Sequence, residues 1–167
     1  NEGYFMKKRI FFLLLCLGYI LTTMDIFNRP IAPKLSDAQE TLIHDTLVDY
    51  MKHDDVELVV VERHKVLRKE ETLKHLKIYL RAYASSYTKD LNAYEGFQSP
   101  TILTYTKENN KWKLKDIWFP KDGSEYESSI RKAFPPNCVK EAMNLDGYDE
   151  EKHQAELEEV KALFDQA

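Results

Sequence analysis

The segment from Leu73 to Tyr87 constrains the fold most, because apolar and polar residues alternate along it. One set of alternate positions is small or aliphatic: Leu76, Ile78, Leu80, Ala82 and Ala84. The other set is aromatic, charged or hydroxyl-bearing: Lys77, Tyr79, Arg81, Tyr83, Ser85 and Tyr87. Since successive side chains of a strand point to opposite faces of a sheet, we predict a long antiparallel strand with one buried and one exposed face.

An amphipathic helix is expected upstream of this strand, over residues 37–53. Ser36 and Gln39 have the spacing of a capping box, in which the two side chains bond each other's backbone N–H groups. Apolar residues then recur at helical spacing: Ala38, Leu42, Ile43, Leu47 and Met51.

Three further strands are predicted, over residues 56–67, 101–106 and 112–119, whereas residues 89–100, which contain Gly96, are predicted as a loop. Asn109 and Asn110 suit a tight hairpin between the last two strands, because asparagine tolerates positive φ. The order of one helix, four strands and then helices predicts an α+β fold of the cystatin-like or NTF2-like kind. In such a fold the first helix covers the apolar face of a four-stranded antiparallel sheet.

Helices are expected after the sheet. Ser124 should cap a short helix that runs to Phe134 and is stopped by Pro135 and Pro136. A narrow apolar stripe predicts another helix over residues 149–164. Residues 137–167 contain three basic and nine acidic residues, so we predict an acidic helical tail after an α+β domain of residues 36–136.

The N-terminal segment has the pattern of a targeting or membrane signal. Lys7, Lys8 and Arg9 precede an apolar run over residues 10–24. As a helix this run would span roughly 22 Å, which is shorter than a bilayer core of about 30 Å. Residues 1–27 are therefore predicted as an uncleaved anchor or a cleaved signal peptide, with a buried helix as the alternative, and residues 28–35 as a linker. Either signal would place the domain outside the cytoplasm, because the positive flank stays inside.

Composition excludes several functions. The net charge of -4 disfavours a nucleic-acid-binding domain, and two cysteines are too few for a disulfide framework or a Cys-based zinc site. The sequence contains no recognisable catalytic constellation, metal-ligand set or cofactor motif, so no catalytic residue, metal or cofactor is predicted.

The best candidate for a binding surface is the polar face of the strand over residues 73–87. It carries Tyr79, Arg81 and Tyr83, and Tyr105 is expected to extend it from the next strand. Tyrosine offers contact area and a hydroxyl, and arginine pairs with anionic groups. We predict that these four residues bind a peptide, a partner protein or an envelope component. A small-ligand cleft, a water-facing sheet and a face covered by the C-terminal helices are the alternatives.

Two other functions stay open. One is a small NTF2-like enzyme that uses His64 or Glu62 as a general base. The other is a structural domain that forms a homodimer through the sheet face.

A second local signal is the run Trp-Phe-Pro-Lys-Asp-Gly-Ser-Glu-Tyr over residues 118–126. Its structural interpretation is that Trp118 and Phe119 anchor a strand end on opposite faces, a turn follows, and Tyr126, Ile130 and Phe134 pack the next helix onto the sheet. The motif residues are Trp118, Pro120, Asp122, Gly123 and Tyr126.

This Trp-x-Pro-x-Asp-Gly-Ser-x-Tyr run resembles a small extracytoplasmic domain of Gram-positive bacteria, the clostridia and their relatives. That domain is found alone or behind a membrane peptidase of the beta-lactam-sensor type. The resemblance covers about residues 56–136 and implies export and a sensory or binding role. The peptidase part has no counterpart in this sequence, so proteolysis is not implied.

Overall fold

The structure is a computed structural model that describes residues 33–54, 56–145 and 150–166. The predicted signal or anchor of residues 1–27, including the apolar run over 10–24, lies outside the described residues. Within the described part, no helix combines the length and the apolar character needed to span a bilayer.

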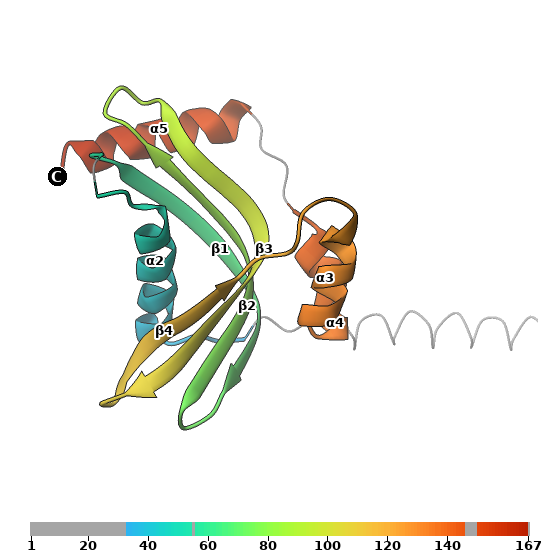
Figure 1. Cartoon of the computed structure of the whole chain (residues 1–167). Coiled ribbons are helices and arrows are strands. Elements are labelled where there is room, and N and C mark those ends of the chain that lie inside the picture. The colour runs from blue at the N-terminus through green and yellow to red at the C-terminus, as the bar shows by residue number, and fades with distance from the viewer. Residues whose placement is uncertain (1–32, 55, 146–149, 167) are drawn as a thin grey trace, which may run out of the picture. The chain divides into compact units, whose positions relative to one another are not determined.

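A four-stranded antiparallel sheet forms the centre of the domain, with the strands in sequence order (Figure 1). The sheet and its accompanying helices confirm the predicted α+β class. The strands are β1 (Val59–Glu71), β2 (His75–Tyr87), β3 (Ala93–Glu108) and β4 (Lys111–Trp118). Asn109 and Asn110 join β3 to β4 with φ of 48° and 64°, as expected of a tight hairpin.

Helix α2 (Asp37–Met51) covers one face of the sheet (Figure 1). Its capping box is present: the backbone N–H of Gln39 donates to Ser36 Oγ at 3.3 Å, and the N–H of Ser36 donates to Gln39 Oε1 at 3.2 Å. The helix buries Ile43 and Leu47 against the aliphatic residues of the sheet. This first core contains Ile43, Leu47, Leu76, Ile78, Leu80, Ala82, Leu103 and Tyr105.

The opposite face of the sheet is also covered, by α3 (Tyr126–Ala133) and α4 (Pro136–Met143) (Figure 1). A 3-10 turn, η1 (Gly123–Glu125), leads into α3. Ser124 does not cap α3, because the cap position belongs to Glu125 and no side-chain cap bond is present. Pro135 and Pro136 end α3 as predicted but also begin α4, since proline is favoured at the first helical position.

Helix α5 (Glu150–Phe164) packs on β1 through a third, smaller core. Val160 is fully buried there against Val61 and Tyr87. Both helices of the predicted acidic tail therefore pack against the sheet, and residues Ile31–Ala167 form one compact unit.

The predicted loop over residues 89–100 is wrong for most of its length, because β3 begins at Ala93. Residues 93–101 pair with β2, whereas the pairing of β3 with β4 starts only at Ile102. Pro100 is compatible with this strand because it lies where β4 does not continue the ladder. Glycine at position 96 avoids a tight contact, since a Cβ there would lie 3.1 Å from Ser85 Oγ and 3.3 Å from the carbonyl oxygen of Ala84.

Candidate functional site

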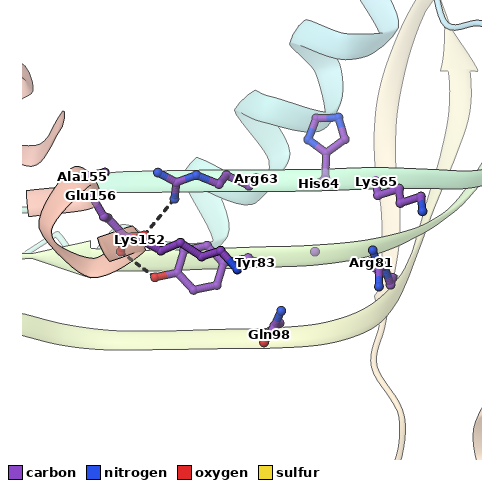
Figure 2. Close-up of a pocket in the computed structure, with 10 residues that line it drawn as sticks. Arg63, His64, Lys65, Arg81, Tyr83, Gln98, Lys152, Ala155 and Glu156 are labelled. Carbon is purple, nitrogen blue, oxygen red and sulfur yellow. Dashed lines mark hydrogen bonds and ion pairs between the residues drawn. The ribbon is translucent and has the colours of Figure 1, made fainter. Parts of the chain in front are cut away.

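A pocket of about 400 Å³ lies between the first three strands and the N-terminal half of α5 (Figure 2). Its walls come from β1, β2, β3 and α5, so it brings together segments from distant parts of the chain. The lining residues are Arg63, His64, Lys65, Arg81, Ala82, Tyr83, Gln98, Lys152, Ala155 and Glu156.

Strand register places the sheet residues of the pocket side by side. Arg63 is paired with Tyr83, and Lys65 with Arg81. Residues two apart on a strand share a face, and directly opposite residues share it too. Four large polar side chains therefore converge on one patch, and Gln98 of β3 joins them opposite Tyr83.

Arg81 is the most buried of these cations, at 8% exposed, and its guanidinium lies 3.9 Å from Glu141 Oε1 of α4. Lys65 Nζ lies 2.5 Å from the same oxygen. One carboxylate of α4 is thus shared by two cations at one end of the pocket.

Glu156 forms the other end of the pocket and is fully buried. Its Oε1 accepts hydrogen bonds from the hydroxyls of Tyr83 and Tyr87, each at 2.5 Å. Its Oε2 accepts from Arg63 at 2.8 Å, and Arg63 also donates to Glu159 at 2.8 Å. The buried carboxylate is therefore satisfied by three donors from the sheet, as a charge removed from water must be.

The charge of the lining is opposite to that of the whole chain. Four Lys or Arg residues and one Glu residue line the pocket, whereas the chain carries a net charge of -4. The alkyl stems of these cations, the Tyr83 ring and Ala155 supply apolar wall between the charged tips. Such a pocket is suited to an anionic group on a small apolar or aromatic body.

The structure separates the four residues that were predicted to form one binding surface. Arg81 and Tyr83 line the pocket. Tyr79 is only 4% exposed and packs edge-on against Phe134 of α3, with ring centroids 5.5 Å apart. The expectation of an open tyrosine face is thus wrong, because the C-terminal helices cover it.

Tyr105 does not extend the tyrosine face. Strand register pairs it with Leu76, and it is Ile102 that lies opposite Tyr79. Tyr105 is therefore on the α2 side, where its hydroxyl lies 2.9 Å from Thr46 Oγ1. Burial raises the pKa of Tyr105 to about 12, which is the behaviour of a core residue.

The motif at residues 118–126 runs from the end of β4 to the start of α3. Trp118 packs against Phe134 on one face, with ring centroids 5.9 Å apart, and Phe119 packs against Tyr50 on the other at 5.3 Å. Gly123 turns the chain with φ of +64°, after the exposed Asp122. Pro120 is half-buried, and Tyr126 is a half-buried neighbour of the second core, where burial raises its pKa.

His64 and Glu62, the predicted general-base candidates, belong to an ion-pair cluster between β1 and α2. His64 Nδ1 lies 3.0 Å from Glu62 Oε2, and its Nε2 lies 3.0 Å from Glu40 Oε2. His44 Nδ1 lies 3.0 Å from the other Glu62 oxygen. Figure 2 shows the imidazole of His64 on the side of β1 away from Lys65 and Arg81.

This arrangement favours a protonated His64, because a neutral imidazole can donate only one hydrogen bond. Burial alone would lower the pKa of His64, but the hydrogen bonds and charges of Glu62 and Glu40 outweigh it and raise the pKa. Burial would likewise raise the pKa of Glu62, yet its two histidine partners lower it. Both ring nitrogens of His64 therefore lie within hydrogen-bond distance of a carboxylate oxygen.

The predicted binding surface did not include five residues that line the pocket: Arg63, Lys65, Gln98, Lys152 and Glu156. Arg63 and Lys65 had a detectable signal, because like charges two apart on a strand repel unless something anionic faces them. Glu156 had none, since an acidic residue on a highly charged helix is normally solvated. Among the described residues, no group of three or more His, Cys, Asp or Glu side chains is arranged to hold a metal ion.

Comparisons with known proteins give no match: no protein-family model fits the chain, and neither curated proteins nor solved structures show significant similarity to it.

Proposed function

We propose that this chain is a non-enzymatic extracytoplasmic binding or sensory domain, tethered to the membrane through residues 10–24. The pocket between the sheet and α5 is its binding site. It takes an anionic group of a peptide, a partner protein or an envelope component. The observation that carries this proposal is the convergence of Arg63, Lys65, Arg81 and Lys152 on one pocket in an acidic protein.

Arg81 and Tyr83 provide the recognition in this proposal. The Arg63 guanidinium lies 5.8 Å from the centre of the Tyr83 ring, so a planar or apolar ligand body has an aromatic wall beside a cation. Arg81 is held by surrounding protein, and a pre-positioned guanidinium loses little conformational entropy when an anion binds.

The location outside the cytoplasm rests on the basic flank of residues 7–9, the apolar run after it and the resemblance of residues 118–126. We further propose a cystatin-like or NTF2-like fold, supported by a helix that precedes a four-stranded antiparallel meander and packs on its apolar face. Protease accessibility of the chain in intact spheroplasts tests the location. Protection until the membrane is permeabilised would contradict it.

Binding is tested by calorimetric titration of the full chain with inorganic phosphate, citrate, and a short peptide with either a free or an amidated C-terminus. We expect at least one free anion to bind and the amidated peptide to bind more weakly than the free one. Lys65→Glu should weaken binding of that anion by about tenfold or more, because it reverses a charge at the pocket.

The matched control is Lys113→Glu on β4, where the lysine is similarly exposed but lies outside the pocket. It makes the same charge change and should leave the affinity within about twofold, since exposed charges outside a site act only through screened long-range forces. Equal losses in both variants, or no binding of any anion to the wild type, would contradict the proposal.

A further inference from the structure

One face of α5 carries three residues at successive helical turns, and each meets a different environment. Lys152, Glu156 and Val160 are spaced four apart, so they lie on the same side of the helix. Val160 is buried in the small third core, Glu156 is held by Tyr83, Tyr87 and Arg63, and Lys152 lines the pocket. Figure 2 shows Lys152 reaching from α5 toward Tyr83.

The two ends of α5 are held to the sheet unequally. Toward its C-terminus, Val160 packs with Val61 and Tyr87, and Leu157 and Phe164 lie at the edge of that core. Toward its N-terminus, the face over the pocket presents Lys152 and Ala155. Buried apolar area therefore holds the turn around Val160 to the sheet more than the turn around Lys152.

We propose that α5 is a lid whose N-terminal half closes on an anion bound in the pocket. This inference rests on the proposed function. The anion lies between Lys152 on α5 and Lys65 with Arg81 on the sheet, and so links the helix to the sheet across the pocket. The hydrogen bonds that the buried Glu156 accepts from the sheet keep α5 in register over the pocket, and the helix opens from this point toward its N-terminus.

Thermodynamic linkage makes this proposal quantitative. An anion that touches both α5 and the sheet binds the closed state better than the open one, so it must shift the equilibrium toward closure. A change that favours opening of α5 lowers the fraction of closed protein, and it weakens anion binding in proportion to that fraction. Couplings of this kind usually amount to about 5- to 150-fold.

An anion that binds the open state of α5 better than the closed state is the alternative outcome of the test. Arg63 already donates to Glu156 and Glu159, so an anion that captured Arg63 would release α5 and open the lid. Closure and release therefore predict opposite changes in the backbone amide exchange of residues 150–156.

The experiment measures hydrogen exchange of α5 in the full chain, without and with saturating inorganic phosphate, or the tightest anion of the titration panel. We expect exchange over residues 150–156 to slow by about tenfold with the anion, while residues 160–164 change less. Lys152→Gln should remove this protection and weaken binding by a similar factor. Lys161→Gln, a matched neutralisation of an exposed lysine that lies outside the pocket, should do neither.

A second pair of variants separates the lid from the pocket itself. Glu156→Gln should speed exchange of α5 without the anion and weaken anion binding, whereas the exposed Glu158→Gln should change neither. Anion binding with unchanged α5 exchange overturns the lid but leaves the binding site standing. Faster α5 exchange with the anion establishes release and overturns closure, and absence of anion binding contradicts both proposals.

Discussion

Tyr87 on β2 and Glu156 on α5 form a hydrogen bond of 2.5 Å in which neither residue is more than 2% exposed, although 69 residues separate them in sequence. Tyr83 donates to the same oxygen. A helix with a thin apolar stripe is thus fixed to the sheet by one fully satisfied carboxylate. Removing any member of such a group leaves a buried polar partner without its bond.

Glu156→Gln is expected to lower the free energy of unfolding by about 1.5–3 kcal/mol, because charge-assisted bonds to buried carboxylates have this magnitude. Urea denaturation provides the measurement. Glu158→Gln on the exposed side of the same helix should stay within about 0.5 kcal/mol of the wild type. Similar effects in both variants would show that Glu156 is not held as described.

Tyr79→Ala is expected to destabilise the domain by about 3–5 kcal/mol and to lower its Tm by roughly 10 °C, because it empties a well-packed site against Phe134. Tyr94→Ala is the control, since Tyr94 is 49% exposed, and its Tm should move little. Calorimetric scans of both variants measure the difference. An unchanged Tm for Tyr79→Ala would contradict the burial of Tyr79 and would support an exposed tyrosine face instead.

Stability should depend on pH through His64 and Glu62. The raised pKa of His64 gives stability that is present below about pH 6.5 and is lost as pH rises through the folded pKa. The lowered pKa of Glu62 gives stability that is present above about pH 4.5 and is lost as pH falls through its folded pKa. The contribution of the cluster is therefore largest between these two ordinary values.

His64→Gln tests this directly when unfolding free energies are compared with the wild type from pH 4 to pH 9. The wild-type advantage should shrink as the pH rises above the raised pKa of His64. The matched control is His75→Gln at the exposed start of β2, which makes the same substitution outside this cluster. A wild-type advantage that is constant across this range would contradict the imidazolium assignment.

Gly123→Ala should cost about 1–2 kcal/mol, because Gly123 has a φ of +64° and an added Cβ meets no neighbouring atom, so the cost is conformational. Ser124→Ala next to it should be nearly neutral, as Ser124 forms no cap. Denaturant midpoints measure both. An equal effect at the two positions would show that the turn, and with it the motif over residues 118–126, does not depend on the glycine.

The part of the fold that sequence analysis predicts well is the part determined by local patterns. The capping box of Ser36 and Gln39 and the strand β2 follow from patterns of neighbouring residues, and both are present in the structure. The strand at 93–100 escaped prediction because its polar residues and Gly96 have low strand propensity, and pairing with β2 alone holds them extended.

The site could be predicted only in part for the same reason. Arg81 and Tyr83 were found because they stand on the alternating strand. The alternation along β2 does not predict that its second face is buried. A face of polar side chains is normally expected to be exposed to solvent, and the residues that cover it here are distant in sequence. Arg63 meets Glu156 across 93 residues of sequence, a separation that no local pattern encodes.

The strand order has a consequence for assembly. Each strand pairs with its immediate successor, so three hairpin closures complete the sheet using only short-range loops. Helix α5 instead must return to β1, the first strand made. During synthesis the sheet and α2 are therefore complete before α5, and Tyr87 is exposed to water at that stage. Tyr87 becomes buried only when the fifteen residues of α5 pack on β1.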